Sequence, residues 1–177
     1  MTARLDEAVE ADLGPLSELA ALTFPLACPP GLDEQVIGVF VAEHLSEHAF
    51  RAYLEAPDHD VLVARSADGA IVGYVLLVAG TAMDPGCARQ IVHRPTTGIS
   101  KFYVHPDHHG AGIASRMLDE VTRRCRDAGA QSIWLATNVA NTRARRFYDK
   151  HGFEPRGNRT FDVGGVANTD VVYELPL

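Results

Sequence analysis

The residues best suited to chemistry lie in one short stretch, where an apolar strand is followed by a proline turn and a glycine-rich segment. Gly110, Gly112 and the small Ala114 fall where the spacing predicts the first turn of a helix. That turn presents unpaired backbone N–H groups and a partial positive charge, and glycine lets an anion approach them closely. The stretch therefore predicts a phosphate-binding loop. It is not a Walker loop, because Gly-Lys-Ser/Thr is absent, and its spacing is not Gly-x-Gly-x-x-Gly.

A second candidate segment runs from Asn141 to Phe153. Helical spacing places Asn141 and Tyr148 on one face, so that both side chains can line one cleft. Each residue also has a purely structural interpretation. An N-cap asparagine, a core Phe-Tyr pair and a helix-ending Gly152 occur in many small α/β domains.

Taken together, the two segments resemble the GNAT superfamily of N-acetyltransferases. The stretch from His109 to Ala114 is similar to the family pattern Gln/Arg-x-x-Gly-x-Gly/Ala, with His109 in place of glutamine or arginine. The second segment is similar to Asn-x-x-Ala-x-x-Phe-Tyr-x-x-x-Gly-Phe. The resemblance implies acetyl-CoA as donor substrate. It also implies an α/β (α+β) fold, in which a mixed, mostly antiparallel sheet of about seven strands carries helices on both faces.

The resemblance assigns roles to individual residues. Backbone amides of residues 102–104 would pair with the pantetheine arm, and the N–H of Val104 would stabilise the oxyanion. A phenol with a pKa near ~10 can protonate a leaving thiolate with a pKa near ~8.5, so Tyr148 is the expected general acid. The expected donor-binding residues are Phe102, Tyr103, Val104, His109, Gly110, Ala111, Gly112, Ile113, Ala114, Ser115, Asn141 and Arg143.

The general base is left open. Many relatives carry a glutamate two to four residues before the position of Phe102, but here these positions are Gly98, Ile99 and Ser100. The candidates that remain are Tyr103, His105, Asp84, His93 and a water molecule on Ser100. Direct transfer is expected, because no cysteine lies in either motif. No metal is expected either, because His105, His108 and His109 lack a ligand set of recognised spacing.

Composition and charge restrict the function further. With 177 residues, of which 46% are hydrophobic, the chain fits one domain over residues 1–177. The net charge of -7 disfavours nucleic-acid and membrane partners. Residues 1–60 carry twelve acidic and two basic side chains. This excess of negative charge is either a solvated helical face or a feature that attracts a cationic substrate. In the second case Glu34, Glu43 and Glu47 would favour a polyamine or an amine antibiotic as acceptor over a protein amine.

The C-terminal part also favours a small amine as acceptor. Residues 161–172 resemble the closing Phe-x-Val-Gly-x-x-x-x-Thr-Asp-x-x-Met pattern of the spermidine/spermine N-acetyltransferase branch, with Val172 in place of methionine. The main expectation is therefore an N-acetyltransferase for a small amine, with residues 1–60 on the acceptor side, 61–163 binding the donor and 164–177 forming a closing strand. The alternative is a non-catalytic acyl-CoA-binding regulatory domain.

The remaining pattern predicts the elements that position these segments. Asp12, Asp33 and Ser46 are expected to cap helices, the first of which should stop before Pro25. Further helices are expected over residues 112–127 and 141–150, and turns or loops over 24–31 and 80–97. The three cysteines are expected to be buried and unpaired. A cytoplasmic location follows from the lack of a secretion signal, and a homodimer from the resemblance. The expected strands lie near residues 3–8, 61–64, 71–78, 98–104, 132–136, 159–163 and 170–174.

Overall fold

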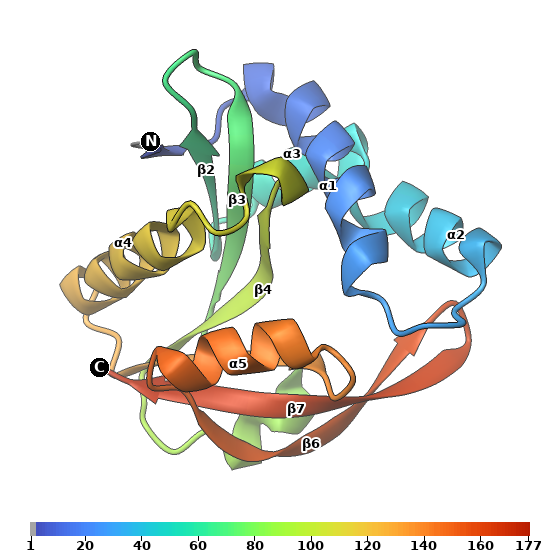
Figure 1. Cartoon of the computed structure of the whole chain (residues 1–177). Coiled ribbons are helices and arrows are strands. Elements are labelled where there is room, and N and C mark those ends of the chain that lie inside the picture. Colours follow the sequence, from blue (N-terminus) through green and yellow to red (C-terminus); the bar gives the residue numbers. More distant parts are fainter. Residues whose placement is uncertain (1–2) are drawn as a thin grey trace.

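One sheet of seven strands organises residues 3–177, the part of the chain that the computed structural model describes. Its strand order is β1-β2-β3-β4-β5-β7-β6 (Figure 1). All neighbouring strands are antiparallel except β4 and β5. The predicted mixed, mostly antiparallel sheet is confirmed. The strands are β1 Arg4–Glu7, β2 His59–Arg65, β3 Ile71–Ala79, β4 Thr96–Val104, β5 Ser132–Asn138, β6 Glu154–Val163 and β7 Val166–Pro176.

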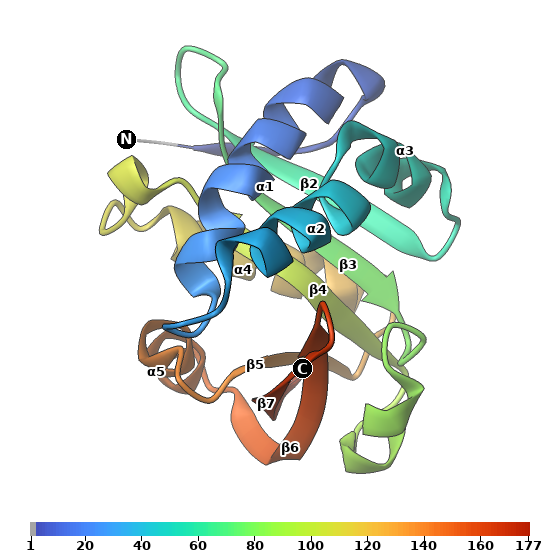
Figure 2. The same cartoon turned by 90° about the vertical axis from the view of Figure 1, so that its right-hand side faces the viewer.

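Helices cover both faces of this sheet. Helices α1 (Leu13–Ala27), α2 (Glu34–His44) and α3 (Glu47–Glu55) pack on one face, and α4 (Ile113–Asp127) and α5 (Thr142–Lys150) on the other (Figures 1 and 2). The α4 stripe forms because its apolar residues recur at helical spacing. Its buried members are the predicted Ile113, Met117, Leu118, Val121 and Cys125.

Side-chain caps begin α2 and α3, as predicted. The Asp33 carboxylate accepts the Gln35 N–H at 2.7 Å at the start of α2, and the Ser46 hydroxyl accepts the Ala49 N–H at 3.2 Å at the start of α3. Such caps satisfy N–H groups that have no partner within the helix.

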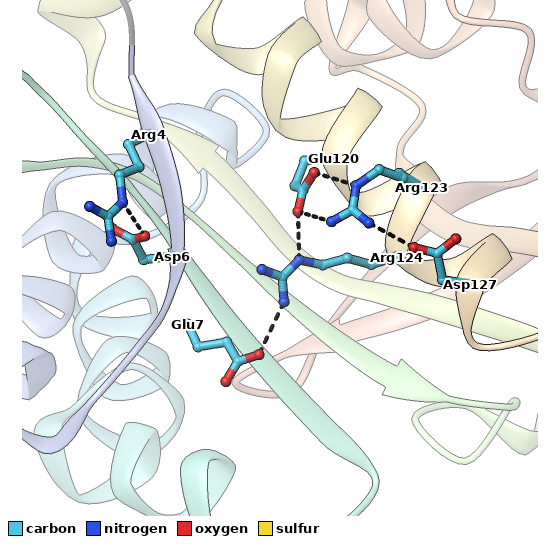
Figure 3. Close-up of polar contacts among 7 residues, drawn as sticks. All are labelled: Arg4, Asp6, Glu7, Glu120, Arg123, Arg124 and Asp127. Carbon is cyan, nitrogen blue, oxygen red and sulfur yellow. Dashed lines mark hydrogen bonds and ion pairs between the residues drawn. The ribbon is translucent and has the colours of Figure 1, made fainter.

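An ion-pair network ties α4 to the edge strand β1 (Figure 3). Glu120 accepts from Arg123 and Arg124, and Arg124 also reaches Glu7 of β1 at 3.2 Å. The hydrogen bonds from the two arginines lower the pKa of Glu120 to about 2. Because the network is largely solvated, it orients α4 more than it stabilises the fold.

A buried carboxylate holds the segment that leads into β4. Glu174 of β7 is 0% exposed and accepts the backbone N–H groups of Val92 and His93 at 3.1 and 2.8 Å. The Arg156 guanidinium donates to it at 2.7 Å. Burial alone would raise the pKa of Glu174, but these hydrogen bonds hold it below its ordinary value.

The prediction for the first helix is confirmed in part. Asp12 is the N-cap residue of α1, which begins at Leu13 as predicted, but its side chain does not cap the helix. The carboxylate instead accepts the Val9 N–H at 2.9 Å, across the short 3₁₀ helix η1 (Glu10–Asp12), and a hydrogen bond from Arg65 at 2.7 Å. The helix also continues past Pro25 to Ala27. Because Pro25 lies in the last turn, its missing N–H removes only one helical bond, while the buried Phe24 stacks on Phe40 of α2 with ring centroids 4.4 Å apart.

Three further expectations need correction. Residues 80–97 are not one open loop, because the 3₁₀ helix η2 (Pro85–Gln90) lies there and Cys87 and Ile91 pack on Trp134. Strands β6 and β7 are longer than predicted, because they pair with each other along almost their whole length. Cys28 is partly exposed, whereas Cys87 and Cys125 are buried as expected.

Between residues 3 and 177, none of the helices combines the length and the apolar character that crossing a bilayer requires.

Candidate active site

The site begins where β4 and β5 separate. The two strands pair only over Thr96–Gly98 and Ser132–Trp134, after which β4 stays with β3 and β5 stays with β7 (Figure 2). A bulge in β4 at Ser100, where the register with β3 shifts, coincides with this divergence. A bulge of this kind bends the strand and re-aims its side chains. The edge of β4 that faces β5 is therefore unpaired beyond Gly98.

The backbone of β4 presents hydrogen-bonding groups to this opening. The N–H of His105 donates to Val72 of β3 at 2.8 Å, so it points away from β5. Because N–H groups alternate in direction along a strand, those of Phe102 and Val104 point toward the opening. An extended ligand can pair with them as an added strand would.

A cavity of about 520 Å³ extends from this edge to the start of α4. Eleven of the twelve predicted donor-binding residues line it, and Ala111 does not. Gly110 and Gly112 adopt φ angles of 81° and 73°, in the left-handed region that glycine tolerates best. The N–H groups of Ile113, Ala114 and Ser115 open α4 and have no helical acceptor, which makes this end an anion site.

Two side chains are held in place beside that anion site. His109 donates its Nε2–H to the carbonyl of Val104 at 2.8 Å, so its ring turns back to the end of β4. The Ser115 hydroxyl donates to Nε2 of His151 at 3.1 Å, because Nδ1 of that ring donates to the Phe147 carbonyl. Arg143 and Lys150 of α5 line the same cavity and supply positive charge.

A second cavity of about 430 Å³ adjoins the first where β4 and β5 diverge. Its walls come from α1, α2, the β6–β7 hairpin and the diverging ends of β4 and β5. The residues shared by both cavities mark the place where two ligands can meet. They are Ala27, Phe102, Tyr103, Asn141, Ala144 and Tyr148.

Tyr148 is placed at this junction by α5. Its ring is 7% exposed and packs against Phe147, Phe153 and Tyr173. Within residues 3–177 its hydroxyl has no hydrogen-bond partner, and it is not one of the enclosed unpaired atoms, so it opens toward the cavities. Burial raises the pKa of the Tyr148 phenol, so the group is protonated at neutral pH. Asn141 caps α5 through the Ala144 N–H at 3.1 Å and lines both cavities with Tyr148, as the shared helix face predicted.

The walls of the second cavity are largely aromatic. Phe24 and Phe40 stack on one side, and Phe161 of β6 meets Phe40 edge-on with centroids 6.1 Å apart. The carboxylates that line this cavity are Asp162 and Asp170. Glu34, Glu43 and Glu47 are exposed and do not line it, which favours the solvated helical face over an attraction for the acceptor.

The structure places only some of the candidates for the general base beside a cavity. Tyr103 and Ser100 line the second cavity. His105, Asp84 and His93 line neither cavity; Asp84 accepts from Arg159 at 2.8 Å and His93 lies 3.4 Å from Glu174. In the described part of the chain, no group of three or more His, Cys, Asp or Glu side chains is arranged to hold a metal ion.

The sequence profile described as the acetyltransferase (GNAT) family matches residues 26–153. The chain belongs to this family. An N-acetyltransferase of Mycobacterium tuberculosis is 40% identical over 161 residues, which cover 91% of this chain and 95% of the relative. An IAA acetyltransferase of Azospirillum brasilense is 28% identical over 124 residues, 70% of this chain and 72% of that one.

Solved structures agree on the fold of this GNAT acetyltransferase. The PaiA N-acetyltransferase of Thermoplasma acidophilum, solved with coenzyme A, covers 100% of both chains with a TM-score of 0.77 and 19% identity. The spermidine/spermine N-acetyltransferase of Vibrio cholerae covers 99% of this chain and 95% of its own, with a TM-score of 0.67 and 17% identity. The protein is therefore an acyltransferase that uses acetyl-CoA as its donor.

Sequence reasoning missed several residues of the second cavity. Phe24, Phe40 and Arg159 carry no motif, and only the fold brings them together. Lys101 was passed over within the β4 strand, although it lines the cavity with its ammonium 5.3 Å from the Tyr53 ring centroid. Burial lowers the pKa of Lys101 to about 8. Asp170 could have been found, because it is the aspartate of the closing motif.

Proposed function

We propose that this enzyme transfers the acetyl group of acetyl-CoA directly to the primary amine of a small molecule. The observation that supports this most strongly is the pair of cavities that meet at Phe102, Tyr103 and Tyr148. One cavity has the strand edge and helix start that suit a pantetheine arm and its pyrophosphate. The other is enclosed by α1, α2 and the β6–β7 hairpin, which suits a small acceptor better than a protein surface.

The roles of the residues follow from this placement. The loop from His109 to Ser115 and the side chain of Arg143 bind the phosphates, and the amides of Phe102 and Val104 hold the pantetheine arm. The N–H of Val104 points toward the opening and stabilises negative charge that develops on the acyl oxygen. Tyr148 donates its proton to the leaving sulfur.

Direct transfer agrees with the state of the cysteines. Cys87 and Cys125 are buried away from both cavities. Cys28 lines the acceptor cavity, but burial raises the pKa of its thiol, which donates to the Phe24 carbonyl at 3.4 Å. A thiol that stays protonated is a poor nucleophile.

A cationic amine suits the acceptor cavity, because carboxylates and aromatic faces both attract positive charge. A polyamine is therefore the first acceptor to test, with Asp162 and Asp170 in place of the helix glutamates as the source of attraction.

The test measures thiol release from acetyl-CoA at pH 7 to 9 against spermidine, spermine, an aminoglycoside, free amino acids and a lysine peptide. We expect turnover with one of the small amines. Turnover with the lysine peptide alone would contradict the small-molecule proposal. Acetyl-CoA binding without turnover across the whole panel would instead favour a regulatory acyl-CoA-binding domain.

A further inference from the structure

Asp170 is the aspartate of the closing motif, and the proposed function assigns it no chemical step. It lies on β7, where the register pairs it with Asn138 of β5 and Arg159 of β6. Its side chain lines the acceptor cavity although the residue is only 3% exposed. A carboxylate is expensive to bury, so a carboxylate in this place needs a partner or a task.

The two oxygens of Asp170 differ in their surroundings. Oδ2 accepts from Arg159 twice, from Nε at 3.3 Å and from Nη2 at 3.2 Å. Oδ1 has no hydrogen-bond partner in residues 3–177, and it is not one of the enclosed unpaired atoms. Because the side chain lines the cavity, this oxygen is accessible from it.

The charges around Asp170 do not balance. Arg159 also donates to Asp84 at 2.8 Å, so one guanidinium serves two carboxylates. The third titratable group that faces Asp170 is the phenol of Tyr103, whose pKa is raised by burial and further by the Asp170 charge. Lys101 lines the same cavity, but its ammonium lies 5.3 Å from the Tyr53 ring centroid. The cluster of Asp170, Asp84 and Arg159 is therefore one positive charge short, and the ammonium group of a substrate in the cavity would supply that charge.

We propose that Asp170 is the catalytic residue that binds the ammonium group of the acceptor and removes its proton. This inference rests on the proposed function and adds to it the group that makes the amine nucleophilic. Arg159 is a positioning residue, because it holds Oδ2 and leaves Oδ1 to face the substrate. The acceptor class that fits is a primary amine that is protonated at neutral pH and whose apolar part lies among Phe24, Phe40 and Phe161.

The proton transfers balance as follows. An N–H proton of the bound ammonium moves to Oδ1 of Asp170, which leaves a neutral amine. The nitrogen forms its bond to the acyl carbon, the carbon–sulfur bond breaks, and Tyr148 protonates the sulfur. The second nitrogen proton returns to the Tyr148 phenolate, and Asp170 releases its proton to solvent. One proton is released for each amide formed.

Burial suits Asp170 to this task. Desolvation raises the pKa of the carboxyl above its ordinary value, which makes it a stronger base, and Arg159 opposes the rise. A base is needed, because an amine with a pKa near ~10.4 is only about 0.1% neutral at pH 7.5.

The decisive experiment compares the pH dependence of kcat/KM for the amine in the wild type and in Asp170→Asn. In the wild type, kcat/KM should be flat between pH 7 and 9.5 apart from a limited step near pH 8, where Lys101 in the same cavity loses its charge. The profile is flat because Asp170 takes the proton from a bound ammonium ion. In the variant, kcat/KM should fall about 10²–10³-fold at pH 7.5. It should then rise about tenfold per pH unit, because only the free neutral amine reacts. Arg159→Gln should keep the plateau and move its acidic limb to higher pH, because the Asp170 charge loses its cation.

The control is Asp12→Asn, which removes a similarly buried aspartate that pairs with Arg65 outside both cavities. It should keep the flat profile. Thermal unfolding and acetyl-CoA binding show whether each variant folds. A flat profile in Asp170→Asn, or a tenfold rise per pH unit already in the wild type, would overturn the assignment. If the wild type acetylates no amine of the panel, the proposed function fails instead.

Discussion

Replacing Tyr148 with phenylalanine gives the sharpest test of the proposed chemistry. The ring packs against Phe147, Phe153 and Tyr173 with centroid distances of 5.4, 5.2 and 6.2 Å, and phenylalanine can keep all three contacts. In the described chain the hydroxyl has no hydrogen bond to lose. We therefore expect the free energy of unfolding to change by less than about 0.5 kcal/mol, because such a substitution leaves packing intact. In a chain of this size that corresponds to a change of about 2 °C or less in Tm.

The effect on the reaction should be much larger. Loss of a general acid typically costs about 10²–10³-fold in rate, which corresponds to about 3–4 kcal/mol of transition-state stabilisation. The assay is thiol release at saturating acetyl-CoA, together with acetyl-CoA affinity by calorimetry. We expect kcat to fall while the affinity for acetyl-CoA stays within about twofold, because the donor is held mainly by backbone groups.

The pH profile provides a second measurement on the same enzyme. A general acid works only while it is protonated, and burial raises the pKa of Tyr148 above that of an ordinary phenol. The wild type should therefore show no loss of kcat up to about pH 10 from ionisation of this group. A Tyr148→Phe variant with kcat within about threefold of the wild type would refute the role of Tyr148, whatever the pH profile shows.

Three further predictions concern the scaffold and the two cavities. Glu174→Gln weakens a buried pair with Arg156 and should cost about 3 kcal/mol, or about 6–12 °C in Tm by circular dichroism at pH 7. Because folding lowers the pKa of Glu174, its contribution to stability is complete above the ordinary carboxyl pKa of ~4.3 and is lost as the pH falls through the lower folded value. The Tm values of the two proteins should therefore become equal in acid. A difference in Tm below 2 °C at pH 7 would contradict the prediction. Phe40→Ala should raise the KM for the amine about tenfold and leave that for acetyl-CoA unchanged, whereas Val39→Ala on the exposed side of the same helix should change neither. Gly110→Ala places a side chain at a left-handed position, so it should cost about 1 kcal/mol in unfolding experiments and raise the KM for acetyl-CoA; unchanged values would show that the loop does not contact the donor.

Local signals predicted most of the secondary structure. The period of apolar residues found α4, and the side-chain caps of α2, α3 and α5 were recognised from the residue before each helix. Local sequence signals failed where contacts between residues far apart in the sequence determine the secondary structure. Asp12 is drawn away from α1 by Arg65, which lies 53 residues along the chain, and Pro25 is tolerated because Phe24 packs on α2.

In the candidate site, too, some features could be predicted from local sequence and others could not. The donor side could be predicted, because its strand, glycine loop and helix start follow one another within a few residues. On the acceptor side, the part played by residues 1–60 could be predicted, but the meeting of Asp170 with Arg159 could not, because it depends on the register of β7 with β5 and β6. That register brings Asp170 opposite Arg159 and puts both beside Tyr103, and local patterns carry no information about it.

The short ladder between β4 and β5 has a consequence for how the molecule holds together. Strands β1–β4 and β5–β7 form two antiparallel halves that share only three residue pairs in the sheet, with α4 as the covalent link between them. If the pantetheine arm pairs with β4 and contacts α5 as proposed, the bound donor contacts both halves. Acetyl-CoA at 100 times its Kd would raise the free energy of unfolding by about 2.7 kcal/mol. The hydrophobic core that joins the two halves lies on the side of the sheet covered by α4 and α5, so the donor would strengthen the opposite end of the junction, where the strands have already separated.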